Sequence, residues 1–150
     1  MEKVSPQATP VIQKQLGYAG LIPFVAIATA IWWLPESRQQ AGYVFVTYSV
    51  VILSFVAGAL WGQLSQSNVQ NSRLLFLLTN VLALVGWGVL FVYPLLALIL
   101  LSFGYIGIYV IESQWMASTY TKGYLTLRLR LTSGVLLSHL SVALCIYTSA

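Results

Sequence analysis

Long apolar runs recur along the chain, and short polar segments separate them. A helix of about 20 apolar residues crosses a hydrocarbon core of about 30 Å, because each helical residue rises about 1.5 Å. The pattern therefore predicts an all-α, polytopic integral membrane protein. We expect a five-transmembrane-helix bundle, a single membrane domain over residues 1–150, with helices over residues of about 16–34, 43–62, 74–92, 94–111 and 127–148.

Composition supports a membrane setting. Of the 150 residues, 59% are hydrophobic and 7% are charged, and the mean hydropathy is +0.84. A soluble domain carries about 25% charged residues, because its surface must face water. The single cysteine, Cys145, excludes an intrachain disulfide. A signal peptide ending near AIATA is a weaker interpretation of the first run, because that run continues through IWWL to spanning length.

The cations are distributed unevenly between the two sides of the predicted bundle. Only Arg38 falls on one side, and the other six fall on the side of the N-terminus. The positive-inside rule then predicts a cytoplasmic N-terminus and a C-terminus outside. The net charge of +4 reflects topology, so we expect no nucleic-acid partner. The six cations are Lys3, Lys14, Arg73, Lys122, Arg128 and Arg130.

Tryptophans near the ends of the predicted helices are candidate membrane anchors, because amphipathic rings favour the headgroup level. Arg130 is a further anchor, since its long side chain can reach anionic headgroups while its stem stays in apolar surroundings. We expect these lipid headgroups on the cytoplasmic side. The tryptophan anchors are Trp32 and Trp33 at one boundary and Trp61 and Trp115 at the other.

The last predicted helix carries a polar seam. Steps of four and eleven residues bring Arg128, Thr132 and His139 close to one helical face, with Tyr124 one turn earlier, whereas Arg130 points away. Glu112 ends the preceding helix on the same side, where it can pair with Arg128. His139 lies near the bilayer midplane. It is most simply a neutral histidine bonded to a neighbouring helix; the alternatives are a ligand or proton-path role, and metal or haem ligation.

Small residues in two helices are candidate packing sites, because they let a second backbone approach closely. Ser54, Gly58 and Gly62 recur every four residues, which favours packing within the bundle over a homodimer seam. Gly17, Gly20 and Pro23 indicate a kink or tight packing in the first helix.

The residue inventory argues against an enzyme. The chain has no aspartate, one histidine and three glutamates, so it excludes a Ser-His-Asp triad and makes a paired-carboxylate site improbable. No metal-ligand spacing and no phosphate-binding glycine loop is present. We expect no catalytic residues, no metal and no cofactor.

Three stretches, LGYAGLIPF (16–24), YSVVILSFVAGALWG (48–62) and YLTLRLRLT (124–132), carry a resemblance over most of the chain. They resemble a domain-of-unknown-function family of small bacterial inner-membrane proteins that also includes the animal mitochondrial transmembrane protein sixty-nine. The resemblance implies a multi-pass protein of the bacterial cytoplasmic membrane, assigns no activity, and favours Arg128 over Arg130 as the motif arginine. Family members often have a polar residue where this chain has Leu60.

Two functional classes follow. The first is a non-enzymatic accessory or assembly protein that packs against a membrane-protein partner. The alternative is a small carrier, channel or lipid-binding protein that uses the seam of Arg128, Thr132 and His139 to hold a polar or anionic group. A closed bundle with Arg128 paired internally favours the first, whereas a cavity that reaches His139 from the cytoplasmic side, or a lipid or solute against Arg128, favours the second.

Overall fold

A computed structural model describes residues 8–67 and 72–148. In these ranges the chain is helical, and five segments are long and apolar enough to cross a membrane, which confirms the predicted all-helical class. The long helices are α1 (Ala8–Trp33), α2 (Arg38–Leu64), α3 (Ser72–Gly88), α4 (Pro94–Val110) and α5 (Lys122–Tyr147). Short turns follow α1 (Pro35–Ser37), α3 (Val89–Phe91) and α4 (Ile111–Trp115, a π-helical turn).

Three helices begin earlier than their apolar runs. α1, α2 and α5 start at Ala8, Arg38 and Lys122 instead of near residues 16, 43 and 127. Hydropathy marks the part of a helix that lies in hydrocarbon, whereas backbone hydrogen bonding continues into the polar boundary. Thr121 stabilises the early start of α5, because its side chain accepts a hydrogen bond from the Tyr124 backbone N–H at 3.2 Å.

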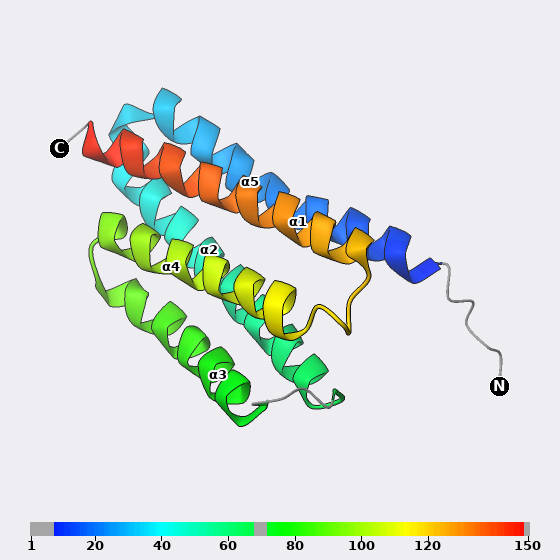
Figure 1. The fold of residues 1–150 in the computed structure, drawn as a ribbon. Coiled ribbons are helices and arrows are strands. Elements are labelled where there is room, and N and C mark those ends of the chain that lie inside the picture. Colours follow the sequence, from blue (N-terminus) through cyan, green and yellow to red (C-terminus); the bar gives the residue numbers. More distant parts are fainter. Residues whose placement is uncertain (1–7, 68–71, 149–150) are drawn as a thin grey trace.

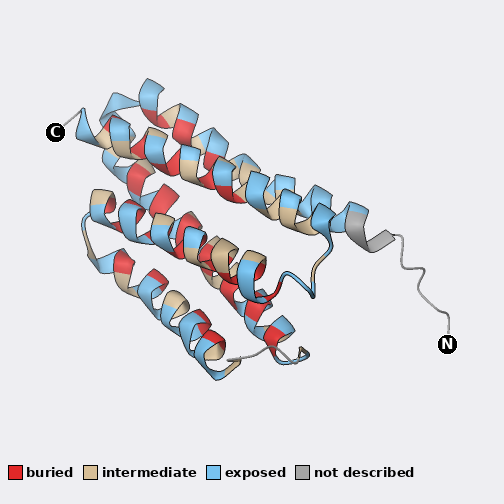
Figure 2. Cartoon of the chain, viewed as in Figure 1, coloured by how far each residue is buried: buried red, intermediate tan, exposed pale blue. Residues whose placement is uncertain are grey.

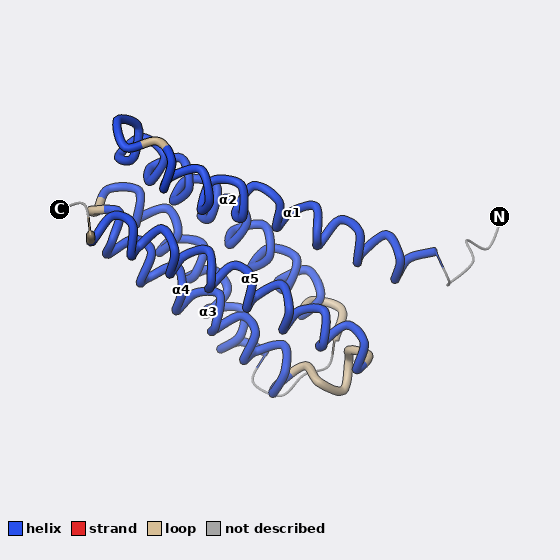
Figure 3. The backbone as a smooth tube through the Cα atoms, turned by 90° about the horizontal axis from the view of Figure 1, so that it is seen from above, coloured by secondary structure: helices blue, strands red, loops and turns tan. Residues whose placement is uncertain are grey.

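The helices are arranged with α2, α4 and α5 around the core, α1 lying along α5 and α3 lying along α2 (Figures 1 and 3). Buried positions face inward on these helices, and the outer faces are exposed (Figure 2). Large apolar side chains such as Trp33, Phe55 and Phe91 are among the exposed ones. Such an apolar exterior suits contact with lipid.

Glycines allow close approach at three positions in this bundle. A Cβ on Gly17 would lie 2.7 Å from Leu131, and one on Gly134 would lie 2.8 Å from Leu21, so α1 and α5 approach each other through both glycines. Gly104 of α4 similarly faces Leu53 of α2 at 2.9 Å. Gly17, one of the predicted packing residues, thus lies close to α5.

Three other glycines among the predicted packing residues have no close neighbour on another helix within the described part of the chain. A Cβ on Gly20, Gly58 or Gly62 would meet no atom of the described residues within 4 Å. The four-residue spacing of Ser54, Gly58 and Gly62 does place them along α2, but α3 does not come close enough to need glycine there. Small residues permit a second helix to approach closely, but they do not require it to do so.

The two described ends of the chain lie at opposite ends of the bundle (Figure 1). Because successive helices alternate in direction, Lys14, Arg73, Lys122, Arg128 and Arg130 share the end at which α1 begins. Lys3 lies outside the described residues. Which end faces the cytoplasm stays a prediction, as do the anchor roles of Arg130 and the four tryptophans. The side chains of Arg130 and of the four tryptophans are exposed, and the Trp32 indole N–H also donates to Ser141 Oγ at 3.1 Å.

Candidate functional site

A closed polar cluster surrounds His139 at the centre of the bundle. We call it the histidine core and define it as His139 of α5, Ser49 of α2, and Ser102 and Tyr105 of α4. The His139 ring nitrogens Nε2 and Nδ1 lie 2.9 Å from Ser49 Oγ and 2.8 Å from Ser102 Oγ. Tyr105 donates its hydroxyl to the Ser49 carbonyl at 2.9 Å. Three helices are therefore joined through one side chain.

The hydrogen bonds assign a tautomer to His139. Ser102 Oγ donates to the Leu98 carbonyl at 2.7 Å, because a carbonyl can only accept. Ser102 Oγ must then accept the bond from His139, which places a proton on Nδ1. Nε2 is left as the acceptor for the Ser49 hydroxyl. A neutral imidazole, with one donor and one acceptor, satisfies both serines, as in the simplest of the sequence-based alternatives.

The imidazole at the centre of the histidine core is buried. His139 is 2% exposed, and the rings of Phe24, Phe45 and Tyr105 surround it at centroid distances of 6.1, 5.4 and 5.6 Å. Among residues 8–67 and 72–148 there is no group of three metal-ligating side chains. The imidazole therefore joins neighbouring helices by hydrogen bonds and packs against aromatic rings.

A buried ion pair joins the end of α4 to the start of α5. Arg128 Nε donates to Glu112 Oε2 at 2.6 Å, and the Tyr124 hydroxyl donates to Glu112 Oε1 at 3.2 Å. Glu112 is 2% exposed and lies on the π-helical turn after α4. The pair considered from the sequence is therefore present, and both carboxylate oxygens are occupied by donors.

The ion pair leaves most of the Arg128 donors unused. A guanidinium has five N–H groups, and the Nε–H is the one that binds Glu112. Within the described part of the chain, Nη1 and Nη2 have no hydrogen-bond partner, and neither atom is buried. Arg128 therefore presents unpaired donors beside a fixed carboxylate.

Arg128 lines a cavity of about 360 Å³, which we call the lateral groove. Its walls come from α1, α2 and α5, with Tyr105 of α4 contributing. Its volume falls within the range of about 300–1,000 Å³ that is typical of ligand pockets. Leu16 and Phe55 line it and are 67% and 72% exposed, so the groove faces the surroundings of the bundle. Its other apolar lining residues include Leu21, Phe24, Ile52, Val56, Leu127, Leu131 and Val135.

Polar side chains gather toward the charged end of the lateral groove. Tyr124 and Arg128 line it from α5, and Gln13 and Gln63 line it from α1 and α2. Thr132 also lines it, one turn deeper than Arg128. The groove is thus apolar along most of its length and polar at one end, which matches the apolar tail and polar head of an amphiphile.

The loop between α4 and α5 braces this polar end. Tyr120 donates its hydroxyl to Gln63 Oε1 and stacks on Tyr124 with a centroid distance of 4.5 Å. Burial, reinforced by the Glu112 charge, raises the pKa of Tyr120 above its ordinary value, so its hydroxyl stays a neutral donor. The loop therefore links the end of α2 to the Arg128 ion pair.

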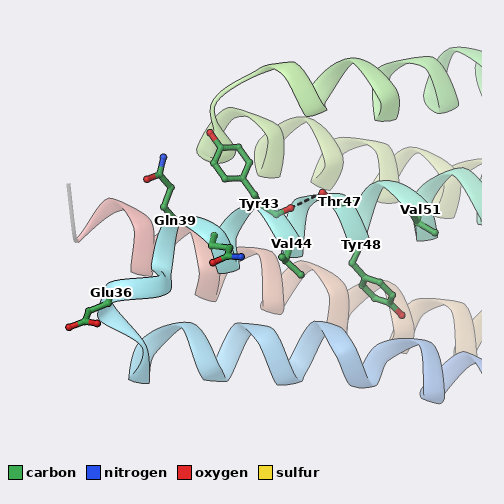
Figure 4. Close-up of a pocket in the computed structure, with 8 residues that line it drawn as sticks. Glu36, Gln39, Tyr43, Val44, Thr47, Tyr48 and Val51 are labelled. Carbon is green, nitrogen blue, oxygen red and sulfur yellow. Dashed lines mark hydrogen bonds between the residues drawn. The ribbon is translucent and has the colours of Figure 1, made fainter.

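A second recess, of about 710 Å³, lies along the first half of α2 (Figure 4). Its polar side chains do not converge. Glu36 and Gln39 point in different directions, and Tyr48 is directed toward α1, where its hydroxyl donates to the Gly20 carbonyl at 2.8 Å. The Thr47 hydroxyl donates a hydrogen bond to the Tyr43 carbonyl of its own helix. This open recess offers no assembled binding group.

A family model described as "Protein of unknown function (DUF3429)" matches residues 9–144. The chain belongs to this family. The match spans all five long helices, the histidine core and the lateral groove. No curated protein matches the chain, and no solved structure does. The relationship to the mitochondrial transmembrane protein sixty-nine stays a prediction.

In this DUF3429 chain the predicted polar seam divides into two places. Tyr124, Arg128 and Thr132 line the lateral groove, whereas His139 lies in the closed histidine core. The three seam residues therefore do not line one cavity, because His139 is buried among aromatic rings. Sequence reasoning did not identify Ser49 and Ser102 as the partners of His139, nor Gln63 and Tyr120 at the end of the groove. Serines in apolar runs were the available signal.

Proposed function

We propose that this membrane protein binds one membrane amphiphile in the lateral groove, without catalysing a reaction on it. The single observation that carries the proposal is the groove itself: most of its lining is apolar, and it is also lined by Arg128, whose terminal nitrogens have no hydrogen-bond partner among the described residues. A chain in the groove would contact α1, α2 and α5, and its polar head would replace water at the guanidinium.

The open position of Gly20 provides a direct test. Gly20 lines the groove, and a Cβ there would have no close neighbour among the described residues within 4 Å, so a leucine side chain would start in open space and project into the groove. Gly58 of α2 is equally open but lies outside the groove, and it supplies the matched control. Native mass spectrometry of gently extracted protein should detect one retained lipid in the wild type and in Gly58→Leu, and a loss of about tenfold or more in Gly20→Leu. Equal retention in both variants would contradict the proposal.

A second candidate function is the accessory role in a membrane complex. It is favoured by the open position of Gly58 on α2, which lines a recess of about 240 Å³ together with Asn80 of α3. Asn80 is exposed and gives one amide hydrogen to the Phe76 carbonyl, which leaves its amide oxygen available to a partner helix. In this case Gly58→Leu should release a copurifying membrane protein, and Gly20→Leu should retain it.

We also propose that the charged end faces the cytoplasm of a bacterial inner membrane. Among the described residues five cations lie at that end and Arg38 lies at the other, which supports this orientation. Reporters fused to the C-terminus should then be active only if their activity requires export. A reporter active in the cytoplasm would reverse the assignment.

A further inference from the structure

The chemistry at the end of the lateral groove restricts which amphiphile fits. We infer that its head group is an anion, a phosphate or a carboxylate, held by the terminal N–H groups of Arg128. This inference rests on the proposed function, because it names the ligand class of the same groove. It adds a selectivity that binding of a lipid tail alone would not give.

The geometry of Arg128 favours an oxyanion. Its Nε–H is committed to Glu112, and the planar guanidinium holds Nη1 and Nη2 in a fixed orientation relative to that bond. Two N–H groups on one edge of a guanidinium match the spacing of two phosphate or carboxylate oxygens. Glu112 therefore orients the arginine, and the unpaired donors remain for the ligand.

Glu112 does not occupy the ligand's place. It is 2% exposed, it is absent from the groove lining, and its two oxygens already accept bonds from Arg128 and Tyr124. The carboxylate compensates part of the arginine charge during folding. It supplies no free acceptor that would favour a cationic head group over an anionic one.

The charge around the groove also favours an anion. At this end the described residues carry one carboxylate, Glu112, against five cations. Charges beside an apolar medium are screened less than charges in water, so this excess attracts an anionic head group and disfavours a cationic one. The five cations are Lys14, Arg73, Lys122, Arg128 and Arg130.

The two arginines of α5 give a matched pair of variants. Arg128 lines the groove, and Arg130, two residues later, is exposed on another face of the helix. Arg128→Ala and Arg130→Ala therefore remove the same charge from the same end of the protein. Arg128→Lys keeps the charge and removes the fork, and Glu112→Gln keeps Arg128 while removing its counter-charge. These two variants remain informative if Arg128→Ala fails to fold.

The experiment reconstitutes each variant in vesicles of equimolar phosphatidylglycerol and phosphatidylethanolamine with identical acyl chains. After gentle extraction, native mass spectrometry measures the ratio of the two lipids on the protein. We expect about tenfold enrichment of phosphatidylglycerol on the wild type and Arg130→Ala, and none on Arg128→Ala. The enrichment should be several-fold smaller on Arg128→Lys, which loses the fork, and on Glu112→Gln, which loses the carboxylate that orients it.

The outcomes separate the two proposals. Retained lipid without head-group preference, or a preference lost equally in Arg130→Ala, overturns the anionic ligand and leaves amphiphile binding intact. A wild type that retains neither lipid overturns the proposed function itself. A parallel series adds inorganic phosphate to lipid-free protein in neutral detergent. Stabilisation that depends on Arg128 there would support the same anion site with a soluble source, and its absence would support a lipid source.

Discussion

The histidine core and the lateral groove both place polar groups of α5 inside the membrane span. They differ in whether the hydrogen-bond donors and acceptors of those groups already have partners. Both ring nitrogens of His139 are bonded, and aromatic rings enclose it. Arg128 is bonded through one nitrogen, its other donors have no partner among the described residues, and the residue lines an open cavity. A polar residue in a membrane helix is therefore a better candidate for ligand binding when its donors are unsatisfied and accessible.

Depth in the membrane would rank these residues the other way. His139 lies deeper along α5 than Arg128, and a polar group near the midplane is the usual candidate for function. In this bundle the deeper residue is the one whose hydrogen bonds are completed by Ser49 and Ser102. Whether a polar group already has its hydrogen bonds, and whether a ligand can reach it, therefore separates the two sites better than depth in the membrane does.

The largest expected effect comes from separating the ion pair. Replacing Glu112 with alanine leaves the Arg128 charge without its partner in a half-buried position, and loss of one member of a buried pair costs about 3–5 kcal/mol. We expect a free energy of unfolding in detergent lower by about that amount in Glu112→Ala and in Arg128→Ala. Thermal or denaturant unfolding of the purified variants measures it.

The double variant shows whether that loss belongs to the pair. Once Arg128 is alanine, adding Glu112→Ala should lower the free energy of unfolding by little more, because the interaction is already gone. Additive losses would mean that each residue stabilises the bundle through other contacts. Arg130→Ala serves as the control and should stay within about 0.5 kcal/mol of the wild type.

A smaller effect is expected in the histidine core. Ser102→Ala removes the acceptor of the Nδ1–H group of His139, and a buried donor without a partner costs about 1–3 kcal/mol. Lipid retention should be unchanged, because Ser102 does not line the lateral groove. Ser65→Ala, which removes an exposed hydroxyl bonded within its own helix turn, provides the control. Loss of bound lipid in Ser102→Ala would contradict the separation of the two regions.

The sequence predicted what depends on local pattern. Hydropathy located five helices, and the short path between Glu112 and Arg128 at one end of adjacent helices allowed their pair to be anticipated. The spacing along α5 also separated Arg128 from Arg130. These inferences needed only the period of one helix and the order of its neighbours.

The interhelical register was beyond such reasoning. Ser49 and Ser102 lie 90 and 37 residues from His139, and their contact depends on how three helices are rotated and shifted against one another. The glycines illustrate the same limit. Gly58 and Gly62 form the more regular pattern, yet the close contacts occur at Gly17 and Gly134, because large side chains on the facing helix decide where a glycine is required.

The smallest expected effect compares a closed and an open position on one helix. Gly17 and Gly20 lie one turn apart on α1 and both line the lateral groove, but only Gly17 faces Leu131 closely, with 2.7 Å from a Cβ to Leu131 Cδ1. Gly17→Ala should therefore destabilise the protein by about 1 kcal/mol, because Leu131 must move. Gly20→Ala should stabilise it by about 0.5–1 kcal/mol, because alanine favours the helix and meets no neighbour.

The sign of the difference between these two alanine variants is the informative quantity. Each variant adds one methyl group to the same helix, so the change in helix propensity is common to both and cancels in the comparison. Unfolding of both proteins in one detergent measures the remaining difference in the free energy of unfolding. That difference reports how much space lies beside each glycine on the side of α1 that faces the groove. If Gly20→Ala were destabilising by as much as Gly17→Ala, the groove beside Gly20 would be filled by protein, and no room would remain for an amphiphile there.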